Sequence, residues 1–245
     1  MRSALFAAEN LEKESAQPGM RVQNSKMLKI ELNGEALARV GSMVAYQGNV
    51  QFKALGSGGL GKFLKHKLTG EGVPLMRLTG QGDVFLADQA ADVHLIDLEP
   101  GDALSINGSN VLAFEPTLEY DIKLVGGTGM FSSAGLFNCV FTGHGRIAIT
   151  TKGKPVVLNI DQPTYVDPQA AVCWSANLQT GYHRAEQLGL GTLLGRRTGE
   201  AFTMSLAGQG FVVVQPCEEP PLLSGGGSGD DDSGGGGLLS SLISS

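Results

Sequence analysis

A short glycine motif that occurs three times constrains the fold of this chain more than any other feature. Its copies begin at positions 80, 143 and 208, so they lie 63 and 65 residues apart. Regular spacing of this kind is typical of structural repeats. Each copy reads Gly-x-Gly-x and then an apolar residue that opens a strand-like run: Gly80-Gln81-Gly82-Asp83-Val84, Gly143-His144-Gly145-Arg146-Ile147 and Gly208-Gln209-Gly210-Phe211-Val212.

A second motif recurs upstream of each glycine motif. In each copy a turn leads into apolar residues that end on an aromatic side chain, at Tyr46, Phe114 and Trp174. The aromatic residue precedes the first glycine by 34, 29 and 34 residues. Because two features recur in one order, we predict that one domain is built from three similar units.

Glycine at alternate positions between two strand-like runs supplies the positive φ that a tight hairpin or bulge requires. A dinucleotide site would instead need Gly-x-Gly-x-x-Gly between a strand and a helix, and here strand formers follow and no third glycine appears. We therefore predict structural hairpins at six glycines: Gly80, Gly82, Gly143, Gly145, Gly208 and Gly210.

Short strand-like runs separated by turn signals fill the chain from residue 21 to 217. Leu28, Ile30 and Leu32 alternate with polar residues, as in a half-buried strand, and Asn33-Gly34 predicts a tight turn. The pattern predicts an all-β fold, in which three tandem β repeats form one pseudo-threefold, barrel-like or sandwich-like domain with few short helices. Residues 1–20 are predicted to be an N-terminal arm.

Residues 218–245 are rich in glycine, serine and aspartate, which predicts a disordered tail. The tail ends in an apolar segment whose four large side chains would share one face of a helix: Leu238, Leu239, Leu242 and Ile243. So short a helix is not stable alone in water. Two interpretations stay open, a frayed terminus and a docking peptide that folds against a partner groove.

The net charge of −6 argues against nucleic acid as a partner, because phosphate-backbone binders carry clustered basic residues. Five basic residues nevertheless fall in two equivalent glycine-rich inserts: Lys62, Lys65, Lys67, Arg196 and Arg197. They form either a solvated rim or an anion-binding or partner-binding patch. The first insert also fits Gly-x-x-x-x-Gly-Lys, but Phe63 follows where a nucleotide site needs Ser or Thr.

No catalytic constellation is evident in the sequence. The four histidines lack metal-ligand spacing, and Cys139 has apolar neighbours that predict a core position. We therefore predict a non-enzyme without cofactor or metal. An odd number of cysteines suits reduced thiols, which favours a cytoplasmic location. No apolar run approaches the length of about 18 residues that predicts a transmembrane helix.

Several motifs together resemble the altered-inheritance-of-mitochondria family over about residues 20–216: Asn24-Ser25-Lys26-Met27-Leu28, the run from Gly41 to Val50, Thr69-Gly70-Glu71-Gly72 and Gly80-Gln81-Gly82. The resemblance implies a β fold like that of the tryptophan RNA-binding attenuation protein, present as three repeats in one chain. Fungal members are linked to mitochondrial inner-membrane organisation. The chain has no evident transit peptide, so we expect a bacterial-type role as a homo-oligomeric binding or scaffold protein with an unknown protein partner. A nucleic-acid or anion binder that uses the loops of Lys62 and Arg196 is the alternative.

Overall fold

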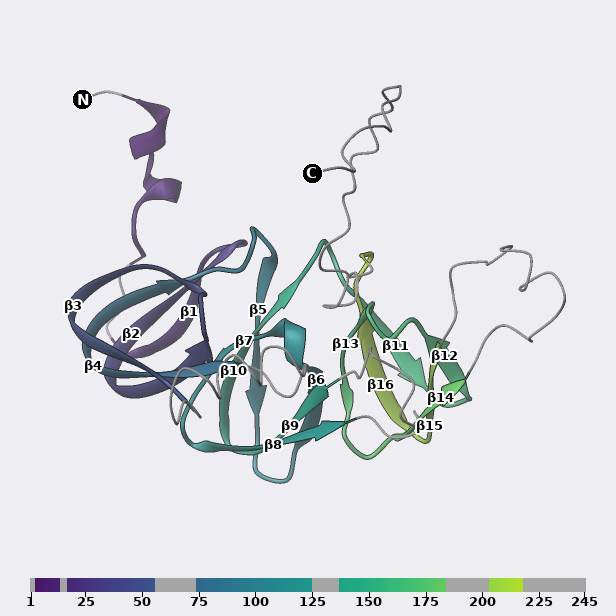
Figure 1. The fold of residues 1–245 in the computed structure, drawn as a ribbon. Coiled ribbons are helices and arrows are strands. Elements are labelled where there is room, and N and C mark those ends of the chain that lie inside the picture. The colour runs from purple at the N-terminus through teal and green to yellow at the C-terminus, as the bar shows by residue number, and fades with distance from the viewer. Residues whose placement is uncertain (1–2, 14–16, 56–73, 125–136, 184–202, 218–245) are drawn as a thin grey trace, which may run out of the picture.

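A computed structural model describes residues 3–13, 17–55, 74–124, 137–183 and 203–217. These residues form strands almost throughout, and short 3-10 turns are the only helical elements among them: η1 (Ala4–Phe6), η2 (Ala8–Asn10) and η3 (Gly108–Asn110). The all-β prediction is therefore confirmed (Figure 1).

The first unit consists of three long antiparallel strands and one added strand: β1 (Gly19–Asn24), β2 (Met27–Arg39), β3 (Met43–Ala54) and β4 (Leu75–Leu86). β4 lies between β2 and β3 and pairs with both along its whole length. β1 pairs with the first half of β2.

The second unit follows the same scheme, with each long strand divided into two: β5 (Asp92–Leu98), β6 (Ala103–Asn107), β7 (Val111–Phe114), β8 (Leu118–Leu124), β9 (Phe137–Gly143) and β10 (Gly145–Thr151). β9 pairs with β6 and β8, whereas β10 pairs with β5 and β7.

The third unit repeats the second strand for strand: β11 (Val156–Ile160), β12 (Thr164–Val166), β13 (Ala171–Ser175), β14 (Gln179–His183), β15 (Thr203–Ala207) and β16 (Gly210–Val214). β15 pairs with β12 and β14, and β16 pairs with β11 and β13.

Strand pairing also joins neighbouring units. β7 pairs with the second half of β2, and β13 pairs with β6. The resulting sheets have the orders β3-β4-β2-β7-β10-β5, β11-β16-β13-β6-β9-β8 and β12-β15-β14. Among the described strands no sheet closes into a barrel, and the first and third units share no sheet. The three units therefore follow one another in an open row (Figure 1).

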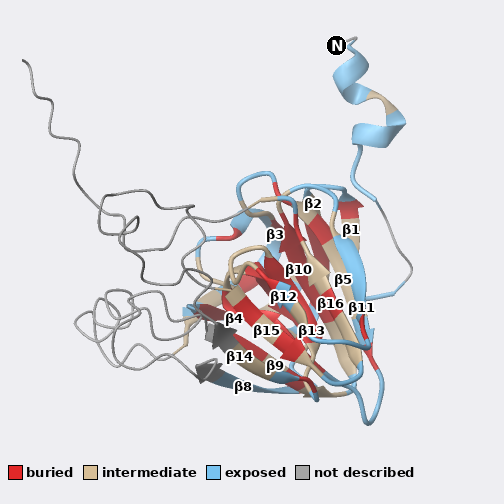
Figure 2. Cartoon of the chain, turned by 90° about the vertical axis from the view of Figure 1, so that its right-hand side faces the viewer, coloured by how far each residue is buried: buried red, intermediate tan, exposed pale blue. Residues whose placement is uncertain are grey.

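Apolar side chains between the sheets form three clusters in the described part of the chain. The middle cluster lies at the centre of the row, where Phe114 packs edge-on against Phe141 at a ring distance of 4.9 Å. Trp174 anchors the cluster of the third unit. Buried residues accordingly run along the strands of each layer (Figure 2).

The glycine motif does not form hairpins, so that prediction was wrong. β4 continues through Gly80 and Gly82. In the other units the chain passes at the motif from one sheet to the next, from β9 to β10 at Gly143 and Gly145 and from β15 to β16 at Gly208 and Gly210. The turn predicted at Asn33-Gly34 is also absent, because β2 runs through it.

The close approach of β3 to β4 explains why glycine is required at positions 80 and 82. Gly80 and Gly82 have φ values of 121° and 150°, in the region that glycine tolerates best. A Cβ on either would overlap a backbone carbonyl of β3, that of Asn49 or of Gln47. Gly34 lies opposite Gly80 in β2, so the glycines mark a bend that neighbouring strands share.

We expect Gly82→Val to lower the free energy of unfolding by about 1–3 kcal/mol, because the side chain meets both an unfavourable φ and the β3 backbone. Gln81→Val is the matched control, since Gln81 is exposed and its φ is not positive. Urea denaturation compares the two. Equal effects of both substitutions would contradict this account of the bend.

Candidate functional site

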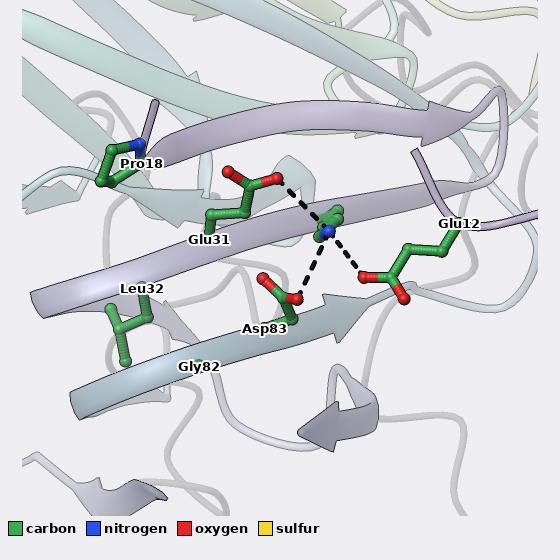
Figure 3. Close-up of a pocket in the computed structure, with 7 residues that line it drawn as sticks. Glu12, Pro18, Glu31, Leu32, Gly82 and Asp83 are labelled. Carbon is green, nitrogen blue, oxygen red and sulfur yellow. Dashed lines mark ion pairs between the residues drawn. The ribbon is translucent and has the colours of Figure 1, made fainter. Parts of the chain in front are cut away.

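An open hollow in the described residues lies where the N-terminal arm crosses β2 and β4. It has a volume of about 450 Å³, and seven residues line it: Glu12, Pro18, Lys29, Glu31, Leu32, Gly82 and Asp83. Figure 3 shows acidic side chains from three segments converging on one lysine.

Lys29 is the centre of this cluster. Its side chain is only 3% exposed, and its Nζ lies 2.6 Å from Glu12 Oε1, 3.3 Å from Glu31 Oε1 and 3.4 Å from Asp83 Oδ2. The ammonium also donates a hydrogen bond to the carbonyl of Lys13 at 3.0 Å. Four oxygen atoms therefore surround a cation that is almost removed from water.

Sheet geometry brings two of the carboxylates into place. Lys29 and Glu31 are two positions apart in β2 and so point to the same face. Asp83 lies directly opposite Glu31 in the register of β4. The ammonium is also 5.9 Å from the centroid of the Phe85 ring, which adds a cation–π contact.

The third carboxylate comes from the arm, which Gln23 holds in place. The Gln23 side chain accepts a hydrogen bond from the Lys13 backbone amide at 3.0 Å and donates one to the Leu11 carbonyl at 2.9 Å. Lys13 Nζ donates to the Val22 carbonyl at 3.0 Å. These contacts on both sides of Glu12 position its carboxylate over Lys29.

The ion pairs move the pKa values in opposite directions. The hydrogen bond from Lys29 lowers the pKa of Glu12 below its ordinary value of 4.5. Burial, the largest single influence on Lys29, would lower its pKa. Hydrogen bonds to Glu12 and Glu31 and the charges of Asp83 and Glu12 outweigh burial, so the pKa of Lys29 is raised above 10.5. Lys29 is thus a permanent cation at neutral pH.

This arrangement stabilises the fold and offers no evident reaction chemistry. A lysine that acts as nucleophile or base must be neutral, whereas these carboxylates keep Lys29 charged. The ammonium occupies the place between the carboxylates that a metal ion would need. No group of three or more metal-ligating side chains was found in the described parts of the chain.

Two of the three cysteines are buried, and His94 has a side-chain partner. Cys139 is buried, as its apolar neighbours predicted, and so is Cys173. Burial raises the pKa of each thiol to about 12, so neither forms the reactive thiolate at neutral pH. His94 Nε2 lies 2.9 Å from Thr151 Oγ1.

A second polar cluster fastens the joint between the first two units. Arg39, the last residue of β2, donates to the carbonyl of Val111 at 2.9 Å and to those of Gly108 and Ser109. It also pairs with Asp88 at 2.8 Å. The Arg39 side chain therefore supplies hydrogen bonds to the backbone carbonyls that lead into the second unit.

Asn107, the last residue of β6, has the same role at the second joint. Its Nδ2 donates to the carbonyl of Ala171 at 3.2 Å and to that of Pro168 at 3.5 Å. Its Oδ1 accepts a hydrogen bond from the backbone amide of Ser109, two residues on, at 3.1 Å. Both joints thus combine strand pairing with a side-chain donor.

Of the sequence-predicted residues that the structure describes, Gly82 lines the hollow, and the other five glycines belong to neither cluster. The five basic residues of the inserts and the apolar residues of the tail lie outside the described residues: Lys62, Lys65, Lys67, Arg196, Arg197, Leu238, Leu239, Leu242 and Ile243. Sequence reasoning missed Lys29 because it alternates with Leu28 and Ile30, which suggests an exposed face. The Lys29-x-Glu31 spacing was a usable signal, but the positions of Asp83 and Glu12 required the fold.

Together, the strand pairing and these two polar clusters define an all-β protein built from three similar units. The profile of the family described as "Mitochondrial biogenesis AIM24" matches residues 20–217, and the chain belongs to this family. The crystal structure of a protein from Streptococcus pyogenes has the same fold, with a TM-score of 0.63 and 20% identity over 82% of this chain and 94% of that one.

A comparison with curated proteins found no significant match. In the described part of the chain no helix is long and apolar enough to cross a membrane.

Removal of the central cation tests the lysine cluster. Lys29→Met leaves three partly exposed carboxylates facing one another without a counter-charge, and we expect it to lower the free energy of unfolding by about 1–3 kcal/mol. Lys26→Met is the control, because the pair of Lys26 with Asp92 is exposed and is expected to contribute less than about 1 kcal/mol. Chemical denaturation of both variants at pH 7 gives the comparison, and similar losses would refute a central role for Lys29.

The pKa of Glu12 gives a pH dependence. Because the folded pKa lies below 4.5, the stabilisation by Glu12 is present above that pH and is lost as the pH falls through the folded value. We expect Glu12→Gln to be less stable than wild type at pH 7 and to approach it well below pH 4.5. Thermal melts across this range measure the difference. A constant difference at all pH values would exclude the ion pair as its cause.

The ionisation of Lys29 gives the opposite pH dependence of stability. Its folded pKa is raised above 10.5, so its stabilisation is complete below that pH and is lost as the pH rises through the folded value.

Proposed function

We propose that this protein is a non-enzymatic binding or scaffold protein that acts as a homo-oligomer on a protein partner in the cytoplasm. The observation that carries the proposal is a run of three consecutive exposed apolar residues on β11, an end strand of its sheet. Val156, Val157 and Leu158 are 56%, 63% and 36% exposed. Edge strands of soluble proteins are usually charged or covered, and exposed apolar patches often mark interaction sites.

The polar groups of the described residues support a binding role over catalysis. Lys29 is held as a cation, the two core thiols are protonated, and the carboxylates around Lys29 are engaged in ion pairs. The bacterial origin of the structural neighbour supports a bacterial-type role. We further propose that residues 21–217 form the domain of three repeats, related to the tryptophan RNA-binding attenuation protein fold, with residues 1–20 as arm and residues 218–245 as tail.

Affinity capture with the full chain as bait tests this function. We expect at least one protein from the native cell to be enriched with wild type and to be lost by about tenfold or more with Val156→Asp/Val157→Asp, because buried carboxylates without partners oppose docking. Gln51→Asp, which adds charge at another exposed strand position, should keep the capture. Quantitative mass spectrometry compares the three baits. Absence of any enriched protein, or equal recovery with the double variant, would count against the proposal.

Two further measurements address the other sequence-based hypotheses. Leu239→Asp/Leu242→Asp in the full chain reduces capture only if the tail is a docking peptide. Filter binding of mixed RNA at low salt tests the basic inserts. Tight binding that weakens steeply with salt would favour the nucleic-acid function in place of the scaffold.

A further inference from the structure

The two joints between units follow one design. At the first joint Phe114 lies opposite Leu37, and Ala113 lies opposite Ala38. At the second, Trp174 lies opposite Ser105, and Cys173 lies opposite Ile106. In both joints the strand that ends on the repeated aromatic residue pairs with a strand of the preceding unit.

Register within the units proves that these positions are equivalent. In each unit the residue that stands three positions before the first glycine of the motif has an equivalent pairing partner. These pairs are Arg77 with Leu37, Val140 with Ser105, and Ser205 with Tyr165. The repeated aromatic residue pairs in each unit with the residue four positions after the first glycine. These pairs are Tyr46 with Val84, Phe114 with Ile147, and Trp174 with Val212.

A bulge fixes the same alignment. The register of β3, β7 and β13 shifts at one residue in each strand, at Val44, Leu112 and Val172. Each of these residues stands two positions before the aromatic residue of its strand. Both the pairing partners and the bulge are therefore repeated in all three units.

The chain contains a third copy of each half of the joint. At the two joints β2 and β6 pair with β7 and β13, which we call the receiving strands. The equivalent of β2 and β6 in the last unit is β12, and the equivalent of the receiving strands in the first unit is the first part of β3. Each is an end strand of its sheet, and they lie at opposite ends of the row (Figure 1). Among the described strands, neither takes part in a joint between units.

Burial shows what a joint does to the receiving strand. All four residues of β7 are fully buried, and Ala171 to Trp174 in β13 are at most 1% exposed. The equivalent residues of β3 are open: Met43 is 40%, Val44 is 55% and Tyr46 is 49% exposed. The apolar character of these side chains fits a strand that becomes covered.

We propose that the first part of β3 in one copy of the chain pairs with β12 of a second copy, in the register of the two internal joints. Tyr46 then lies opposite Tyr165, and Ala45 lies opposite Val166. This inference deepens the proposed function, on which it rests, by assigning the surface that forms the homo-oligomer. Because the two halves differ, the contact is head-to-tail and extends into a ring or a filament.

The strength of this contact depends on Asp167, which takes the place of Arg39 and Asn107. Its Oδ1 accepts a hydrogen bond from the Gln169 amide at 2.6 Å, just as Asn107 accepts from Ser109. A carboxylate, however, cannot donate to the backbone of the receiving strand. The contact between copies therefore lacks the side-chain donor of the internal joints, and we expect assembly to depend on concentration.

Two variants that each block one half test the proposal. Val44→Lys and Tyr165→Lys place a charge where the internal joints are buried, while both positions are exposed in the single chain. We expect each purified variant to sediment as a monomer at concentrations where wild type assembles. An equimolar mixture should form a dimer, because each variant keeps the half that the other has lost. Gln51→Lys, on β3 but beyond the joint, should assemble like wild type.

Asp167→Asn is the complementary gain-of-function variant. It keeps the acceptor for Gln169 and adds the donor that Asn107 supplies, so we expect half-maximal assembly at about a five- to tenfold lower concentration. Sedimentation velocity over a concentration series measures the shift.

The alternatives give different results. Assembly by another surface leaves both lysine variants with the mass of wild type, which overturns this contact but not the homo-oligomeric scaffold. A mixture of the two variants that stays monomeric likewise overturns the head-to-tail contact. Wild type and Asp167→Asn that are both monomeric at every concentration overturn the contact and the homo-oligomer together, while partner capture remains a separate measurement.

Discussion

Antiparallel pairing between a strand of one unit and a strand of the next is the interaction on which the rest of this structure depends. At both joints the strand that ends on the aromatic residue, β7 or β13, is buried, whereas Met43, Val44 and Tyr46 of β3 are exposed. Repeat proteins share this property, since a single repeat cannot bury its own apolar face. The side chains of Arg39 and Asn107 reinforce the pairing by satisfying the backbone that enters the following unit.

The glycine motif makes this arrangement sterically feasible. In the second and third units the strand segments on its two sides pair with different neighbours, so the chain passes there from one sheet to the next. In the first unit the turn is a bend in three continuous strands, and in the others it is a passage between sheets. The same residue pattern thus lies within a continuous strand in the first unit and between two strands of different sheets in the others.

The Lys29 cluster has a different role, because it attaches a segment that is not part of any sheet. One buried ammonium holds carboxylates from the arm, β2 and β4, and Gln23 fixes the arm on both sides. The cluster fixes the arm over β2 and β4 of the first unit, whereas Val156, Val157 and Leu158 of β11 in the third unit are exposed.

The sequence by itself determined the all-β class, the number of units, the core position of Cys139 and the family, because alternation, spacing and glycine motifs are local signals. It did not determine how strands pair. The glycine pairs suggested hairpins, but Gly80 and Gly82 are required by the carbonyls of Asn49 and Gln47, which approach from a distant strand. Lys29 looked exposed for the same reason, since Glu12 and Asp83 reach it only in the folded chain. Pairing register and ion-pair partners depend on contacts between segments far apart in sequence, and only the tertiary structure decided them.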